Sequence, residues 1–195
     1  MSYNEISFKP TSDTLFRAHG TKQIHHIWLA STRPRTPYKR MRALPHTSSC
    51  FVCGESNAIG LRIRFETDGA VVRARFVPSP EHVGFKGTIH GGIIATLLDE
   101  IMVWACAVST KRFAYCAELN VRFLAPLRPG EEVLASAELV SNKRNKLFEA
   151  RGEIRTPAGM LLSVGTGKYL PIKEAELSAM MTDFVAGADD LFGQP

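Results

Sequence analysis

The stretch that decides the fold is GFKGTIHGGIIATLLDE, which runs from Gly84 to Glu100. A histidine and two glycines come directly before an apolar run, and Asp99 and Glu100 interrupt that run. The apolar residues continue to about residue 109, which predicts a helix over residues 91–109 that is buried on most sides. A lone carboxylate inside such a helix is costly unless it is compensated, so Asp99 is either paired or functional.

Segments of alternating apolar and polar residues flank this helix and predict β-strands. Two of them precede the helix and four follow it, at residues 61–65, 71–77, 118–124, 132–140, 146–155 and 161–170. The pair Asp68-Gly69 suits a hairpin turn, and the short connections between the later segments indicate antiparallel pairing. Only a sheet that curls around the helix can cover it on most sides. The predicted fold is therefore α+β, with an antiparallel sheet wrapped around one long central helix.

The length of 195 residues suggests one domain with extensions. Residues 1–47 are expected to form a basic, proline-containing extension, residues 48–172 the folded domain, and residues 173–195 a tail with a helix around 175–187. The extension holds a cluster of Lys and Arg at residues 33–42 that accounts for the whole net charge of +5. Because the charge is so localised, and no two-helix DNA-reading pattern is visible, the sequence does not predict nucleic-acid binding.

Targeting and membrane segments are not expected. Charged residues are spread over the first twenty positions, which leaves no apolar leader. The apolar run at residues 93–108 is short for a membrane span and contains two acids. We therefore expect a cytoplasmic protein without a membrane segment.

Four cysteines occur, at positions 50, 53, 106 and 116. Cys50 and Cys53 form a C-x-x-C pair, which supplies two of the four ligands of a structural zinc site. His46 is a possible third ligand, but no fourth is evident, so the sequence favours unpaired structural thiols and predicts no metal. A disulfide framework is not expected without a secretory signal.

The start of the predicted helix suits the binding of negative charge. Its first backbone N–H groups lack partners within the helix, and the glycines after His90 let a ligand approach them closely. Such a site fits an anion or a developing oxyanion, although no P-loop or dinucleotide-binding motif is present. Gly91 and Asp99 are separated by about 12 Å of helix, so one carbonyl carbon cannot touch both. Either two separate sites exist, or two copies of the helix share one site in a dimer.

The sequences HGGIIATLLDE and ELNVRFLAPLRPGE resemble the hotdog-fold acyl-CoA thioesterases of the PaaI-like group. CFVCGESNAIGLRIRF resembles the opening of a bacterial branch of that group, and the resemblance covers residues 48–172. It implies a homodimer or dimer of dimers that hydrolyses acyl-CoA to free acid and CoA, without a cofactor. By position, it makes Asp99 the general base or nucleophile, the Gly91 backbone N–H the oxyanion donor, and His90 a residue that orients the thioester. Asp99 of the partner subunit would serve the Gly91 site.

Two positions depart from the family pattern. Many members carry Asn six residues before the His, where this chain has Gly84, although others with a similar G-x-x-G-x-x-H-G-G loop also lack it. The Thr or Ser that commonly holds the attacking water is Cys116 here, and a thiol is a weak hydrogen-bond partner. We expect Gly84, Gly92 and Cys116 to contact the substrate. Lys143 and Arg144, in a turn between strands, are expected to bind the nucleotide end of CoA.

Other functions remain open at this point. A hotdog protein can bind or sense acyl-CoA without cleaving it, and a related reaction is hydration or dehydration of an acyl thioester. The hydratase arrangement D-x-N-x-x-H is not found in the sequence. Glu100 points about 100° away from Asp99 around the helix and is expected to form a salt bridge or cap a loop. Trp104 is expected in the core.

Overall fold

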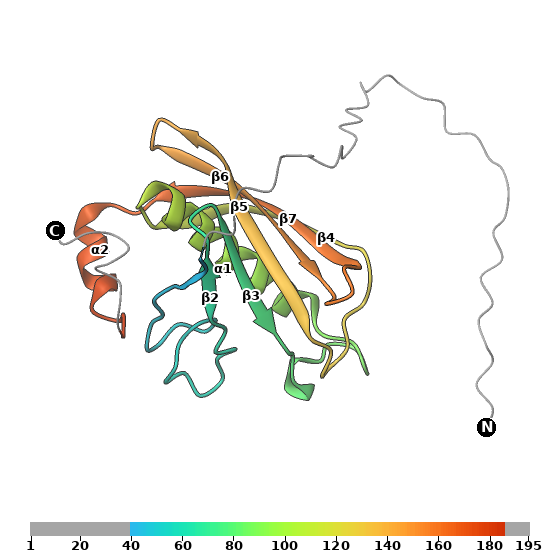
Figure 1. Cartoon of the computed structure of the whole chain (residues 1–195). Coiled ribbons are helices and arrows are strands. Elements are labelled where there is room, and N and C mark those ends of the chain that lie inside the picture. Colours follow the sequence, from blue (N-terminus) through green and yellow to red (C-terminus); the bar gives the residue numbers. More distant parts are fainter. Residues whose placement is uncertain (1–39, 186–195) are drawn as a thin grey trace, which may run out of the picture. The chain divides into compact units, whose positions relative to one another are not determined.

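The computed structural model describes residues 40–185 and has one antiparallel sheet with a long helix against it (Figure 1). The sheet order is β1-β2-β3-β5-β6-β7-β4. The strands are β1 (Arg42–Ala43), β2 (Phe65–Thr67), β3 (Val71–Phe76), β4 (Ala114–Phe123), β5 (Val133–Lys143), β6 (Leu147–Arg155) and β7 (Leu161–Pro171). The helices are η1 (Pro80–His82), α1 (Gly91–Thr110) and α2 (Glu174–Met181). The predicted fold class is confirmed.

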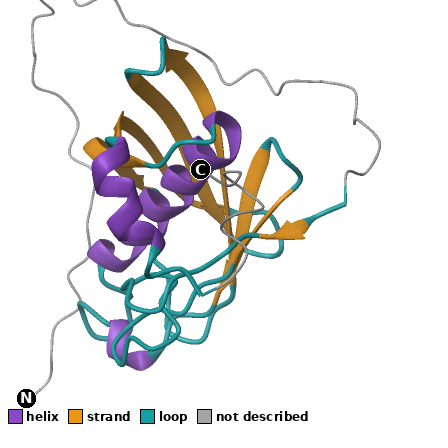
Figure 2. Ribbon diagram, turned by 90° about the vertical axis from the view of Figure 1, so that its left-hand side faces the viewer, coloured by secondary structure: helices purple, strands orange, loops and turns teal. Residues whose placement is uncertain are grey.

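Helix α1 is the centre of the core. It lies against the sheet (Figure 2). It packs against β3, β5, β6, β7 and β4, and ten of its side chains are buried. Glycines on the inner face of the sheet make this close packing possible, because a Cβ at Gly152 or Gly165 would lie 3.3 Å from the side chain of Met102. By length and hydropathy α1 could also cross a membrane, but here the sheet covers its apolar side chains, as expected for a core helix.

The predicted hairpin before α1 is present, but its first strand is shorter than expected. Asp68 Oδ1 accepts hydrogen bonds from the N–H groups of Ala70 and Val71, both at 2.9 Å, and so fixes the turn between β2 and β3. The prediction of a strand from residue 61 was wrong. Arg62 has a left-handed backbone (φ 53°), and Ile63 donates its N–H to Val52 O at 2.9 Å instead of joining the sheet.

The four strands after α1 are all present, and several are longer than the alternation predicted. β5 to β7 form a continuous meander, and β4 pairs with β7 at the end of the sheet order. The outer edge of β4 therefore has no partner strand among residues 40–185. Most residues of β4 are exposed in the single chain, including Tyr115 and Phe123 at 53% each. An unpaired strand edge of ten residues exposes backbone N–H and C=O groups with which another strand can pair.

The C-terminal part folds back onto the start of the domain. α2 is shorter than the predicted helix, and Val185 donates its N–H to His46 O at 3.0 Å. The ring of Phe184 contacts Trp104 edge-on, with centroids 6.3 Å apart, and Trp104 is buried as predicted. Residues 1–39, with most of the basic cluster, and residues 186–195 lie outside the described part. The division into extension, domain and tail stays a prediction, although Arg42 already belongs to the sheet.

Candidate active site

The start of α1 is capped by its own histidine. His90 has an extended backbone, and its Nδ1 accepts a hydrogen bond from the N–H of Gly92 at 2.8 Å. A Cβ at Gly92 would lie 2.8 Å from this Nδ1, so a glycine makes room for the imidazole ring. The Gly92 N–H is therefore used within the chain. In a neutral ring, an acceptor at Nδ1 places the proton on Nε2, which can then donate to a ligand.

The N–H of Gly91 remains available at the same helix start. It has no hydrogen-bond partner among residues 40–185, as expected for the first N–H of a helix. The ring of Phe123, from β4, lies 3.3 Å from where a Cβ of Gly91 would be. Gly84 packs against the other side of His90, since a Cβ there would lie 2.9 Å from His90 Cδ2. An Asn at position 84 would displace the imidazole from this arrangement.

Asp99 lies two turns further along α1 and is held by a residue that the sequence analysis did not identify. The hydroxyl of Tyr169, from β7, donates to Asp99 Oδ1 at 3.1 Å, and the whole side chain of Tyr169 is buried. A Cβ at Gly167 would lie 2.6 Å from the Tyr169 ring, so this glycine lets the ring lie flat across β7 toward α1. Burial, followed by the charge of Asp99, raises the pKa of Tyr169, which therefore stays a donor at neutral pH.

The sequence prediction that Asp99 is buried is only half right. Asp99 is partly buried in the single chain, because the side of α1 that carries it lies near the open edge at β4 rather than under the middle of the sheet. Its second contact comes from that strand. The thiol of Cys116 hydrogen-bonds with Asp99, and burial, followed by this contact, raises the pKa of the thiol to about 11. Cys116 thus stays protonated and points its S–H at the carboxylate.

Lys143 is the last residue of β5 and Arg144 the first of the tight turn to β6, in which Arg144 and Asn145 both have left-handed backbones. Lys143 pairs with Glu149 at 2.6 Å, while Arg144 has no such partner among residues 40–185. The β6 residue Phe148 pairs with Tyr169, which bonds Asp99, and only Leu147 separates Phe148 from this turn. The basic turn and Asp99 therefore lie at the same end of the sheet.

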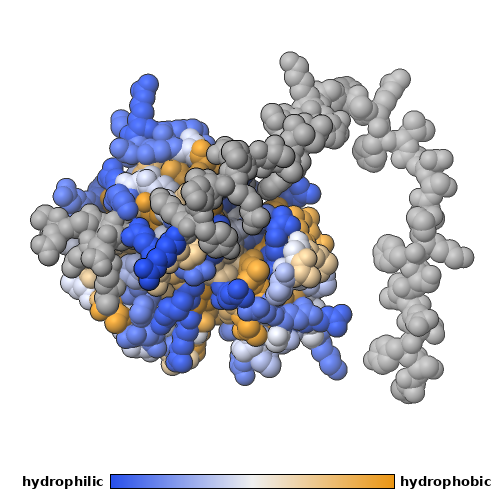
Figure 3. All heavy atoms as spheres, viewed as in Figure 1, coloured by the Kyte–Doolittle hydropathy of each residue, from blue (hydrophilic) through white to orange (hydrophobic). Residues whose placement is uncertain are grey.

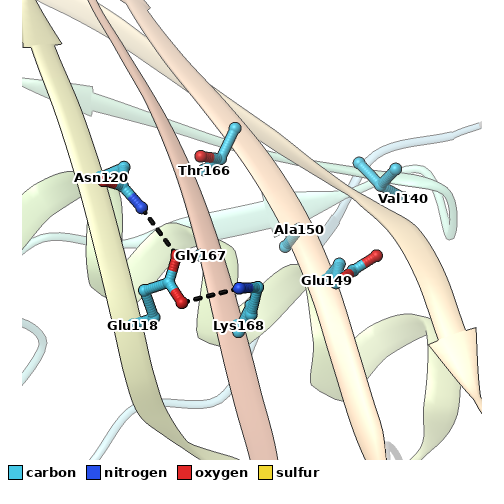
Figure 4. Close-up of a pocket in the computed structure, with 8 residues that line it drawn as sticks. All are labelled: Glu118, Asn120, Val140, Glu149, Ala150, Thr166, Gly167 and Lys168. Carbon is cyan, nitrogen blue, oxygen red and sulfur yellow. Dashed lines mark hydrogen bonds and ion pairs between the residues drawn. The ribbon is translucent and has the colours of Figure 1, made fainter.

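A shallow pocket of about 260 Å³ lies on the opposite face of the sheet. Figure 4 shows its side chains on the side of the strands away from α1, with Glu118 joined to Lys168 and Asn120. Strand alternation explains the contrast, because Lys168 points outward and the next residue, Tyr169, points inward to Asp99. Polar and apolar residues are mixed on this face (Figure 3). The pocket is separate from the candidate site.

Comparisons with known proteins identify thioesterases as similar to this chain. Residues 86–163, which include the start of α1, Asp99 and Cys116, match the family model of the thioesterase superfamily. Acyl-coenzyme A thioesterase 13 from Homo sapiens and from Mus musculus are each 29% identical to this chain over 87 residues. The match covers 44% of this chain and 61% of each relative, so the chain spans less than two thirds of their length.

Solved structures agree at the level of the fold. A crystal structure of a thioesterase superfamily protein has a TM-score of 0.58 and 27% identity, and the match covers 62% of each chain. The Escherichia coli PaaI protein from the phenylacetic acid degradation operon has a TM-score of 0.53 and 19% identity, over 58% of this chain and 81% of its own. The class is a hotdog domain with a carboxylate on its central helix. The match of residues 86–163 to the thioesterase superfamily agrees with the resemblance seen in the sequence.

Proposed function

We propose that this protein hydrolyses an acyl-CoA to the free acid and CoA, with Asp99 as general base or nucleophile and the Gly91 N–H as oxyanion donor. The observation that carries the proposal is the pairing of Asp99 with Tyr169 at 3.1 Å, on the same helix whose first N–H has no partner among residues 40–185. A buried hydroxyl that bonds one carboxylate oxygen holds the carboxylate in a fixed orientation, from which it can accept a proton from water. The match to the thioesterase superfamily and the likeness to acyl-coenzyme A thioesterase 13 support this chemistry.

The reaction follows from these groups. Asp99 takes a proton from water while the water oxygen attacks the thioester carbonyl, and the Gly91 N–H stabilises the oxyanion that forms. Collapse of this intermediate breaks the C–S bond, and the CoA thiolate leaves and is protonated. Alternatively, Asp99 attacks the carbonyl itself and expels the CoA thiolate, and water then hydrolyses the resulting anhydride. A single turnover in H₂¹⁸O that leaves label in Asp99 identifies this second route, because water has then attacked the Asp99 carbonyl of the anhydride.

Two subunits are needed to assemble such a site. Gly91 and Asp99 are about 12 Å apart along α1, too far to act on one carbonyl group. The unpaired edge of β4 carries exposed Tyr115 and Phe123 and lies beside the face of α1 that bears Asp99. Pairing of two β4 edges would continue the sheet through a dimer and set the two helices antiparallel. The Gly91 N–H of one protomer would then face Asp99 of the partner subunit.

The basic turn supplies a place for the nucleotide end of the substrate. CoA carries phosphates, and the guanidinium of Arg144, without a partner among residues 40–185, can bind them as a forked donor. Lys143 is already paired with Glu149, so we assign the larger part of this role to Arg144.

The first test is release of free CoA from short, medium, long and aryl acyl-CoAs, followed with a disulfide reagent. Wild-type protein should hydrolyse at least one of them, and Asp99→Asn should lower turnover by about 10²- to 10⁴-fold. Glu118→Gln is the matched control, because it removes a carboxylate on the outer face that pairs with Lys168, and it should leave turnover unchanged. Binding without turnover in the wild type would point to an acyl-CoA sensor, and full activity of Asp99→Asn would remove Asp99 from the chemistry.

A second test addresses the shared site. Gly91→Pro deletes the oxyanion N–H, and proline is well tolerated at the first position of a helix after an extended residue such as His90. Gly91→Ala adds a Cβ but keeps the N–H, so it should retain most activity. Mixing inactive Asp99→Asn with inactive Gly91→Pro subunits should restore about a quarter of wild-type activity, since half of the dimers then hold one intact site of two. No restoration after subunit exchange would contradict a site shared between subunits.

A further inference from the structure

The C-x-x-C segment folds into a tight turn in which backbone N–H groups bond the sulfur and the carbonyl oxygen of Cys50. The N–H of Val52 donates to Cys50 Sγ at 3.2 Å, and the N–H of Gly54 donates to Cys50 O at 2.9 Å. A Cβ at Gly54 would lie 2.3 Å from Cys50 O, so only a glycine permits this turn. The turn therefore holds Cys50 Sγ in a fixed position beside the carboxylate of Glu100.

Glu100 brings a carboxylate from α1 to this turn. Its Oε1 lies 4.0 Å from Cys50 Sγ and accepts a hydrogen bond from Trp104 Nε1 at 3.2 Å. The ligand atoms of Cys50, Cys53 and Glu100 all lie within 4.8 Å of one another. In a tetrahedral zinc site the ligand atoms are about 3.5–3.8 Å apart, from Zn–S and Zn–O bonds of about 2.3 and 2.0 Å. Side-chain shifts of about 1 Å would close the three atoms around one ion.

Within residues 40–185, the three acidic groups of this cluster meet without an ion-pair partner. Cys53 is 1% exposed, and none of the ion pairs found in residues 40–185 includes Glu100. The guanidinium of Arg64 binds the carbonyl oxygen of Cys53 at 2.7 Å rather than a thiol. Three acidic groups that converge without a counter-charge are the surroundings that a bound cation neutralises.

We propose that Cys50, Cys53 and Glu100 bind one thiophilic divalent cation, Zn²⁺ by the softness of its two sulfur ligands, with a fourth position open to water. This differs from the expectation drawn from the sequence, which found only the C-x-x-C pair and His46. His46 is engaged elsewhere, because its Nε2 bonds Glu55 at 3.0 Å. The third ligand comes instead from α1, fifty residues away, in the position where a salt bridge or loop cap was predicted. The ion would fasten the segment before β2 to the central helix beside Asp99.

The experiment uses the full chain, reduced and stripped of metal with a chelator. Zn²⁺ is titrated against a chromophoric indicator, and Co²⁺ serves as a spectroscopic probe, because thiolate ligation gives a charge-transfer band and tetrahedral geometry gives intense visible bands. One ion per chain is expected, with a rise in the melting temperature on Zn²⁺ addition. Glu100→Gln should keep the charge-transfer band but weaken Zn²⁺ binding at least tenfold. Cys106→Ser, which changes a buried thiol of α1 outside the cluster, should bind like the wild type.

The cysteine variants decide the outcome. Cys50→Ser changes a partly exposed residue and should fold, so it carries the test even if the buried Cys53→Ser variant does not. Loss of the cobalt charge-transfer band in Cys50→Ser supports the site. Equal Zn²⁺ affinity in the wild type and Cys50→Ser would overturn it, and so would the absence of any thiolate-to-cobalt band in the wild type. None of these readouts depends on thioesterase activity.

Discussion

The reactivity of Cys116 toward an alkylating reagent tests the geometry around Asp99 without any substrate. Partial burial and the neighbouring carboxylate raise the pKa of this thiol to about 11 from its ordinary value of 9.0. At pH 8 this lowers the thiolate fraction by about 90-fold, while the greater nucleophilicity of a more basic thiolate recovers roughly eightfold. Cys116 should therefore react about tenfold more slowly than a free cysteine at pH 8, although it lies in an exposed part of β4.

The pH profile is the sharper readout. Alkylation with iodoacetamide, resolved by peptide mass spectrometry, should keep accelerating about tenfold per pH unit beyond pH 9 and level off only near pH 11. Asp99→Asn removes the negative charge but keeps an oxygen for Tyr169, so the pKa of the thiol should fall. The rate at pH 8 should then rise, although by less than the thiolate fraction does, because a less basic thiolate is less nucleophilic. Glu118→Gln, on the same strand but facing the outer side, should leave the profile unchanged. A plateau near pH 9 in the wild type, or an identical profile in Asp99→Asn, would refute the contact between Cys116 and Asp99.

Three further predictions concern the site and its support. Cys116→Thr replaces a weak donor with a hydroxyl and should maintain or raise turnover; a large fall would show that the thiol has its own role. Tyr169→Phe removes only the hydroxyl that fixes Asp99, so turnover should fall about tenfold and the free energy of unfolding by about 1–2 kcal/mol, and unchanged turnover in steady-state assays would contradict a positioning role. Leu98→Ala leaves a cavity that the facing glycines cannot fill, because Leu98 is fully buried. It should lower the free energy of unfolding, measured by urea denaturation, by about 3–5 kcal/mol, against less than about 1 kcal/mol for Leu124→Ala at a half-exposed position.

The periodicity of the apolar residues was sufficient to predict α1 and the four strands that follow it. α1 begins at Gly91 as expected because His90 supplies the cap and the glycines precede a continuous apolar run. The prediction of a strand from residue 61 was wrong because the alternation of apolar and polar residues there has another cause. Leu61 and Ile63 bond to the backbone of Phe51 and Val52 in the C-x-x-C turn, and that pairing holds them out of the sheet. Alternation reports which side chains are buried, but it does not report which backbone the strand pairs with.

Tyr169 shows why the site could be predicted only in part. Its ring points inward from β7, and an inward tyrosine needs a partner for its hydroxyl, which was a usable signal. The alternation of residues 161–170 places it on the same face as Gly165 and Gly167, so the face was predictable. The partner was not, because Asp99 lies seventy residues earlier, and only the packing of α1 on β7 brings the two together. The roles assigned to His90, Gly91 and Gly92 stay predictions until the variants are measured.

The sequence by itself determined that one helix carries two adjacent carboxylates behind a glycine-led start, and that strands must wrap it. It could not determine what each carboxylate does, because neighbouring residues of a helix point about 100° apart and meet different parts of the sheet. Tertiary structure turned Asp99 toward Tyr169 and Cys116 near the open β4 edge, and Glu100 toward the thiols of the C-x-x-C turn. Both sets of contacts join residues far apart in the chain, and such contacts leave no periodic signal in the sequence. They exist only once the sheet has closed around α1.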